Sequence, residues 1–175
     1  DEGLVGDAGM NKMGERKLII VGFGIIGKGV AKVLAEKGSL IKKQYGTDLI
    51  LVAICEYNGC VIDPNGIDPA RAVELAMARK LNTHPKWTEE KTLNAIRDVE
   101  ADIVVEVTPT SVETGEPGTS HMLAALKSGK HLVTSNKGPL ALNFWKLVDT
   151  AKENNVHFRY EATVCGGMPL SLIHI

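Results

Sequence analysis

Short apolar runs alternate with longer amphipathic stretches along most of the chain. Five runs have the length and composition of buried strands, and polar or glycine-rich residues follow each of them. The expected strands cover residues 17–21, 49–55, 101–107, 130–134 and 156–161. Helical spacing of apolar residues predicts helices over residues 29–37, 69–80, 89–99, 119–128 and 142–154. This alternation predicts an α/β fold with a doubly wound parallel sheet and right-handed crossovers.

Capping residues predict the carboxyl end of one helix and the amino end of another. Gly38 follows the helix predicted over 29–37 and is expected to cap its carboxyl end. Asp68 and Pro69 are a typical N-cap and first-turn pair for the helix that follows them.

Glycine and polar residues gather where the predicted strands end. They lie at 22–27, at Glu56, at 108–110, at 135–137 and at 161–168. In open α/β sheets, ligands bind beyond the carboxyl ends of the strands. The sequence therefore predicts a single ligand-binding edge.

The residues after the first strand form a GxGxxG motif. Its members are Gly22, Phe23, Gly24, Ile25, Ile26 and Gly27. In such a motif Gly22 allows the tight turn, Gly24 lets the backbone approach a pyrophosphate, and Gly27 lets the helix pack on the strand. Because helix-start N–H groups attract anions, the motif predicts dinucleotide binding and a Rossmann fold. A merely structural glycine turn is the other interpretation.

Glu56 closes the second predicted strand, 29 residues beyond Gly27. A carboxylate at this position accepts hydrogen bonds from the adenosine ribose and repels a 2′-phosphate, which favours NAD over NADP. Lys28 and Lys32 are near enough in sequence to offset that repulsion. Glu56 could equally be a solvated acid at a strand end, so the cofactor is NAD or NADP.

Lys137 lies in the segment SNKGP after the predicted strand 130–134. We interpret this segment as a loop at the same edge as the glycine motif. A lysine there can hold a polar substrate or move a proton, although most loop lysines are simply solvated.

Composition excludes several classes of protein. The chain has 175 residues, with 20 Lys and Arg against 21 Asp and Glu, so nothing in its charge favours a nucleic-acid partner. No apolar stretch approaches the length of a membrane span, and residues 1–16 lack the apolar core of a signal peptide. Three cysteines without a CxxC pair suit a reducing, cytoplasmic environment. Cys165 could be a nucleophile, but a small buried apolar role is the commoner one.

Four segments together resemble the homoserine dehydrogenase family in their order along the chain. They are GFGIIGKGVAKVL, VTPTSVETGEP, HMLAALKSGKHLVTSNKGPLAL and YEATVCGGMPL, and the resemblance covers residues 17–170. It implies an NAD(P)-dependent oxidoreductase that interconverts L-homoserine and L-aspartate 4-semialdehyde, in threonine and methionine biosynthesis. It also implies a homodimer for the full-length enzyme.

The resemblance assigns roles to individual residues. Those at the dinucleotide are the glycine motif with Glu56, Thr108, Pro109, Ser135 and Lys137. Lys137 also contacts the substrate and takes part in catalysis. Backbone oxygens of four residues match a sodium site, namely Glu161, Val164, Gly166 and Met168. Cys165 stands where the family usually has glycine.

We expect a lead-in over residues 1–16, a Rossmann domain over 17–161, and over 162–175 the start of a connection to a second domain. In the family that domain contributes substrate-binding residues and the dimer interface, so the fragment is expected to be inactive alone. Two other interpretations stay open: another amino-acid or semialdehyde dehydrogenase, and a regulatory module that senses a nucleotide without transferring hydride.

Overall fold

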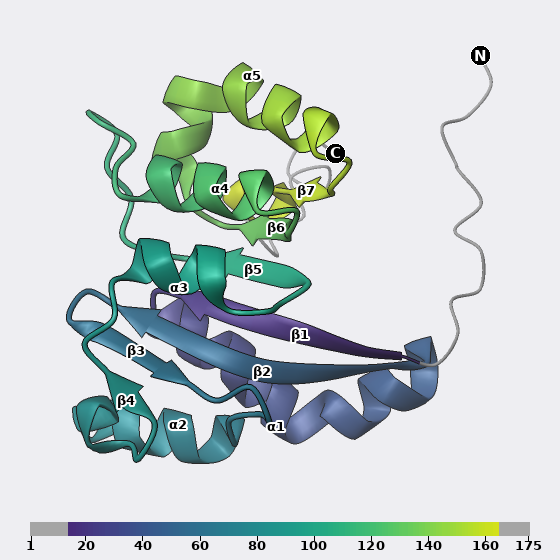
Figure 1. Ribbon diagram of the computed structural model, residues 1–175, viewed down its shortest axis with the longest axis vertical. Helices are drawn as coiled ribbons and strands as arrows, with labels where there is room; N and C mark the ends of the chain where they lie inside the picture. Colours follow the sequence, from purple (N-terminus) through teal and green to yellow (C-terminus); the bar gives the residue numbers. More distant parts are fainter. Residues whose placement is uncertain (1–13, 165–175) are drawn as a thin grey trace, which may run out of the picture.

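The structure, a computed structural model, describes residues 14–164 of the chain. One sheet of seven strands runs through it, with helices on both faces (Figure 1). The strands are β1 (Gly14–Val21), β2 (Thr47–Glu56), β3 (Gly59–Ile62), β4 (Trp87–Thr88), β5 (Ile103–Glu106), β6 (His131–Thr134) and β7 (Phe158–Arg159). The helices are α1 (Ile25–Tyr45), α2 (Pro69–Met77), α3 (Thr92–Asp98), α4 (Gly118–Lys127) and α5 (Lys137–Glu153), with two short 3₁₀ turns, η1 (Leu81–Thr83) and η2 (Glu161–Thr163).

The strand order across the sheet is β4-β3-β2-β1-β5-β6-β7. The four neighbouring pairs β2-β1, β1-β5, β5-β6 and β6-β7 are parallel, which confirms the predicted Rossmann architecture. After β1 the chain adds strands on one side, and from β5 onward it adds them on the other. The crevice between the ends of β1 and β5 is therefore the switch point where this fold binds ligands.

Two apolar layers hold the sheet between the helices. Side chains alternate along β1, so that Ile19 and Val21 join one layer while Leu18 and Ile20 join the other. The first layer packs under α3, α4 and α5, and the second packs under α1 and α2. The sheet is thereby buried on both faces, as the continuous apolar strands predict.

The sequence analysis missed an antiparallel extension of the sheet. β2 turns back after Tyr57 and Asn58 into β3, which pairs with it from Glu56 opposite Gly59, and β4 pairs with β3. These strands have four and two residues. Runs so short carry too little periodicity to distinguish a strand from a loop.

The predicted end of the first helix was wrong. α1 continues through Gly38 to Tyr45, and Gly46 ends it with φ of 68° and a hydrogen bond of 2.9 Å from its N–H to the Lys42 carbonyl. Gly38 has no such left-handed conformation. The left-handed turn, rather than the glycine as such, is what stops a helix.

Other boundaries moved by smaller amounts. β1 begins at Gly14 rather than at Lys17, and β7 keeps only two residues of the predicted strand 156–161. Asp68 caps α2 as predicted, since its carboxylate accepts a 2.9 Å hydrogen bond from the N–H of Ala70. Across residues 14–164, no helix combines the length and apolar character that crossing a bilayer requires.

The two glycines at the end of α1 give a stability test. A Cβ built on Gly38 meets no atom within 4 Å. We expect Gly38→Ala to raise the free energy of unfolding by about 0.5–1 kcal/mol, because alanine loses less backbone entropy in a helix. Gly46→Ala, at φ of 68°, should lower it by about 1 kcal/mol. Urea unfolding followed by circular dichroism measures both, and equal effects of the two variants would contradict the assigned helix end.

Candidate functional site

The glycine motif forms the turn from β1 into α1. Gly22 has φ of 92°, and its N–H donates a 2.8 Å hydrogen bond to the Cys55 carbonyl at the end of β2. A Cβ on Gly27 would lie 2.1 Å from the Gly22 carbonyl oxygen, a distance that no side chain allows. α1 therefore starts directly against the end of β1, as the motif predicts.

The start of α1 is open to an anion. Gly24 occupies the N-cap, no side chain caps the helix, and its first turn contains no acidic residue. A Cβ on Gly24 would meet nothing within 4 Å, so the backbone there faces open space. Free N–H groups at a helix start, with no side chain in front of them, fit a pyrophosphate.

Side chains in this turn divide into two kinds. Phe23 is buried in the layer under α1, whereas Ile25 is 89% exposed and Ile26 is also exposed. Of the predicted motif residues, Phe23 thus anchors the turn, and the two isoleucines lie on the surface beside it.

The turn after β1 touches the segment after β5. A Cβ on Gly22 would lie 2.8 Å from the Thr108 nitrogen and from the Val107 carbonyl. The N–H of Val107 also donates a 2.8 Å hydrogen bond to the Val21 carbonyl. The structure therefore brings the glycine motif and Thr108 together at the switch point, as the sequence predicts.

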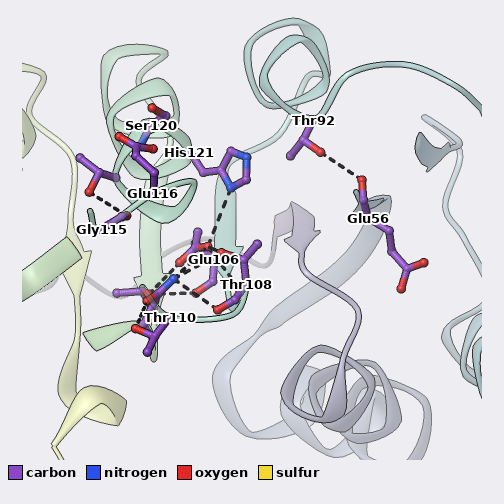
Figure 2. A network of polar contacts seen from close by, with 12 residues as sticks. Glu56, Thr92, Glu106, Thr108, Thr110, Gly115, Glu116, Ser120 and His121 are labelled. Carbon is purple, nitrogen blue, oxygen red and sulfur yellow. Dashed lines mark hydrogen bonds and ion pairs between the residues drawn. The ribbon is translucent and has the colours of Figure 1, made fainter. Parts of the chain in front are cut away.

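Glu56 ends β2 on the other side of β1, where its carboxylate is half-buried. Burial raises the pKa of Glu56, and the Lys28 ammonium counteracts part of this shift. Its backbone carbonyl accepts a 3.2 Å hydrogen bond from the Thr92 hydroxyl, and its side chain extends away from that contact (Figure 2). Lys28 therefore lies within electrostatic reach of this carboxylate.

An open cavity of about 410 Å³ adjoins Glu56. Asn58, Arg79, Trp87 and Glu89 are among the residues that line it. The sequence analysis missed this cavity, because most of its lining residues come from short elements and turns between β2 and α3 that the apolar pattern did not predict. Its wall contains groups of both charge signs, the carboxylates of Glu56 and Glu89 and the guanidinium of Arg79.

A polar cluster lies beyond the ends of β5 and β6, and its centre is Glu106. The Glu106 carboxylate is fully buried and accepts hydrogen bonds from the Thr108 N–H at 3.1 Å and from the Thr108 hydroxyl. The Asn136 amide lies 3.5 Å from it. The Thr134 hydroxyl lies 3.3 Å from it and donates a 2.8 Å hydrogen bond to the backbone carbonyl of Glu106. Figure 2 shows Thr108 and Thr110 beside Glu106 at the centre of this cluster.

Asn136 links this cluster to α5. It is 3% exposed, and its amide nitrogen lies 3.3 Å from both the carbonyl and the hydroxyl oxygen of Thr108. Its amide oxygen accepts a 2.5 Å hydrogen bond from the Thr110 hydroxyl. The same Thr110 oxygen accepts a 2.9 Å hydrogen bond from the N–H of Gly138 in the first turn of α5. The side chains of Asn136 and Thr110 thus link the loop after β5 to the first turn of α5.

Lys137 is the first residue of α5, so the prediction that it lies in a loop was wrong. Asn136 is extended and occupies the N-cap, but its side chain makes no capping bond because it faces the loop after β5. Lys137 itself is exposed. A Cβ on Gly138 would lie 2.0 Å from the Ser111 carbonyl, so the first turn of α5 packs directly on that loop.

Two other predicted residues lie beside this cluster. Ser135 is half-buried between β6 and α5, and Pro109 is exposed in the loop after β5. The cluster itself was not predicted. The one available signal was an acid, Glu106, inside the apolar strand ADIVVEV.

The structure places half of the predicted sodium ligands. Glu161 begins η2, where its carboxylate lies 3.5 Å from Arg159 and its carbonyl accepts from the N–H of Val164 at 3.3 Å. Val164 is exposed. Gly166 and Met168, and also Cys165, lie outside the described residues. Within residues 14–164, His, Cys, Asp and Glu form no group of three that could hold a metal ion.

Comparison with known proteins gives one consistent family. Residues 22–161 match the family described as "Homoserine dehydrogenase, NAD binding domain". The chain is 46% identical over 155 residues to the homoserine dehydrogenase of Methanocaldococcus jannaschii, covering 87% of this chain and 46% of that protein. It is 37% identical over 161 residues to the NAD(+)-dependent homoserine dehydrogenase of Pseudomonas canavaninivorans, covering 90% of this chain and 46% of that protein.

A solved structure shares the fold. A hyperthermophilic archaeal homoserine dehydrogenase, as a mutant in complex with NADPH, superposes with a TM-score of 0.76 at 27% identity. The match covers 91% of this chain and 47% of that one. The chain therefore spans about half the length of the proteins that it matches.

Gly24 offers a test of the anion site that leaves the fold intact. Because a Cβ there points into open space, Gly24→Ala should change the melting temperature little. The added methyl group keeps a pyrophosphate away from the backbone, so NAD binding should weaken by about tenfold or more. Gly29→Ala, in the second turn of α1, is the matched control, because a Cβ there also meets no atom within 4 Å. Equal NAD affinities of the two variants, measured by calorimetry, would show that the pyrophosphate does not bind at this turn.

Proposed function

This chain belongs to the homoserine dehydrogenase family, and we propose that it forms the dinucleotide-binding part of an enzyme that interconverts L-homoserine and L-aspartate 4-semialdehyde. The single observation that supports the proposal is the meeting of the glycine turn and the segment after β5, with no side chain between them. That contact forms a backbone cradle at the switch point of the sheet.

The residues present fit a dinucleotide. The open backbone at Gly24 and the uncapped start of α1 would hold its pyrophosphate, and Glu56 would accept hydrogen bonds from its adenosine ribose. Thr108, Pro109 and Ser135 would lie on its nicotinamide side, with Ile25 and Ile26 beside the pyrophosphate. When bound, the cofactor supplies the hydride chemistry, taking a hydride from the carbon that carries the alcohol.

Lys137 would hold the substrate at the same edge. Its ammonium is exposed on the first turn of α5, next to the polar cluster around Asn136. There it can donate hydrogen bonds to the carboxylate or the hydroxyl of homoserine and help move the hydroxyl proton as the hydride leaves. The exposed cation beside Ser135 favours an enzyme over a nucleotide sensor, which has no use for a substrate group.

The choice between NAD and NADP rests on Glu56 and its neighbours. The acid disfavours a 2′-phosphate, while Lys28 at the start of α1 and Arg79 in the adjoining cavity carry the opposite charge. We propose that the repulsion between Glu56 and a 2′-phosphate outweighs the attraction of these cations, so that the chain binds NAD more tightly than NADP.

The remaining parts of the function concern the complete enzyme. We propose a homodimer in the cytoplasm that serves threonine and methionine biosynthesis, with a second domain that adds substrate contacts. A sodium ion on backbone oxygens of Glu161, Val164, Gly166 and Met168 belongs to the same proposal. We propose residues 17–161 as the Rossmann domain and 162–175 as the start of the connection.

The affinity of the chain for each dinucleotide tests both the proposal and Glu56. We expect calorimetry to show weak binding of NAD and still weaker binding of NADP. Glu56→Ser should bring the two affinities together or reverse them, because it removes the charge that repels the 2′-phosphate. No heat from a folded sample with either ligand at millimolar concentration would contradict dinucleotide binding.

Glu89→Ser is the matched control for this experiment. Glu89 is a second carboxylate on the wall of the same cavity, so its loss changes the net charge by the same amount. The control should leave the ratio of NAD to NADP affinity unchanged. An equal shift in both variants would mean that net charge, and not a contact at Glu56, sets the preference.

Lys137→Ala tests the substrate role in a full-length enzyme that contains this chain. We expect homoserine oxidation to slow by about 10²–10⁴-fold, the usual range for a group that helps to transfer a proton. Lys146→Ala, another exposed lysine of α5, is the control and should keep its activity. Steady-state kinetics measures both, with circular dichroism as the check on folding. If the Lys137→Ala enzyme keeps an activity within about twofold of wild type, Lys137 has no role in substrate binding or catalysis.

A further inference from the structure

The buried carboxylate of Glu106 carries the inference drawn here, which rests on the proposed function. Burying a charged group costs several kcal/mol unless hydrogen bonds replace its water. Glu106 has 0% exposure, and among the described residues no lysine or arginine pairs with it. Its carboxyl oxygens are therefore satisfied by hydrogen bonds, and the identity of the bonded residues indicates what the group does.

The hydrogen-bond partners of Glu106 come from two segments, the one after β5 and the one that joins β6 to α5. Thr108 supplies its N–H and its hydroxyl from the segment after β5. Asn136 approaches from the N-cap of α5 with its amide nitrogen. Thr134, at the end of β6, donates to the Glu106 backbone carbonyl at 2.8 Å and accepts from the N–H of Asn136 at 2.9 Å, so it links the two. A carboxylate needs donors in fixed directions, so it sets these two segments relative to one another.

His121 does not complete this arrangement. Its Nδ1 lies 3.9 Å from the Glu106 carboxylate, beyond hydrogen-bonding distance, and has no partner in the described part of the chain. Figure 2 shows its ring pointing from α4 toward Glu106. The hydrogen bonds to Glu106 thus run toward the ligand edge, through threonine and asparagine, rather than back into the helix layer.

We infer that Glu106 is a positioning residue, whose buried carboxylate holds Thr108 and the start of α5 in place for the nicotinamide end of the dinucleotide. Glu106 does not touch the ligand, because it is completely buried. It acts through Thr108, which adjoins the glycine turn, and through Asn136, which precedes Lys137. Gly24 and Glu56, which would hold the adenosine and pyrophosphate end, make no hydrogen bond to this cluster within residues 14–164. In this part of the chain the glycine turn meets the cluster only where Gly22 packs against Thr108, so we expect the two ends of the dinucleotide to be bound independently.

This independence predicts a selective defect. ADP-ribose contains the adenosine, the pyrophosphate and the second ribose but lacks the nicotinamide. Glu106→Gln puts an NH₂ donor where the carboxylate accepts from several donors, so the loop after β5 should shift. We expect the dissociation constant for NADH to rise by about tenfold and that for ADP-ribose to change by less than about twofold. Nicotinamide fluorescence and calorimetry measure the two constants.

Three further variants keep the test decisive. Glu116→Gln makes the same change in an exposed carboxylate of the same loop and should alter neither constant. Thr134→Val removes a buried hydroxyl that cannot touch a ligand and that links the Glu106 backbone carbonyl to the N–H of Asn136. It should reproduce the selective loss if Glu106→Gln fails to fold. Thr134→Ser restores the hydroxyl and should restore NADH affinity.

The outcomes separate the inference from the proposed function. A parallel loss of NADH and ADP-ribose, or unchanged NADH affinity in folded Glu106→Gln and Thr134→Val, would overturn the positioning role. Wild-type chain that is folded but binds neither ligand would overturn the proposed function, and the positioning role with it.

Discussion

A contact between backbones, with no room for any side chain, governs the ligand edge of this protein. The start of α1 lies against the Gly22 carbonyl, and the other face of Gly22 lies against Val107 and Thr108. Substituting either glycine of this contact means that the backbone has to move, because 2.1 and 2.8 Å are far below van der Waals distances. The direction of α1, the opening at Gly24 and the position of the segment after β5 all follow from this close approach.

Two kinds of interaction build the two halves of the edge. On the side of β1 and β2 the exposed backbone would be the binding group, and in the proposed function side chains act there mainly through charge, at Glu56 and Lys28. On the side of β5 and β6 the backbone is shaped by side chains, with Glu106 and Asn136 buried beneath the surface. A substitution on the first side should therefore act on affinity for the phosphates, and one on the second side should act on geometry.

The sequence was sufficient for the five parallel strands and the glycine turn, because these depend on local apolar patterns and on one motif. It was insufficient where the deciding contact is distant. Lys137 belongs to a helix because the first turn of α5 is held by Thr110, a residue 28 positions away from Gly138. The cluster around Glu106 was not predicted for the same reason. Thr134 and Asn136, which hydrogen-bond to Glu106, lie 28 and 30 positions after it in the chain.

The order of strands also has a consequence for synthesis. β1 lies in the middle of the sheet, and its partner on one side, β2, follows it closely, with Leu18 opposite Leu51. Its partner on the other side comes much later, because Leu18 faces Ile103, 85 residues further on. At about 5–20 residues per second, a ribosome needs about 4–17 s to make that stretch. Throughout this interval the emerging chain has an apolar strand with one unpaired edge, the kind of surface that chaperones protect.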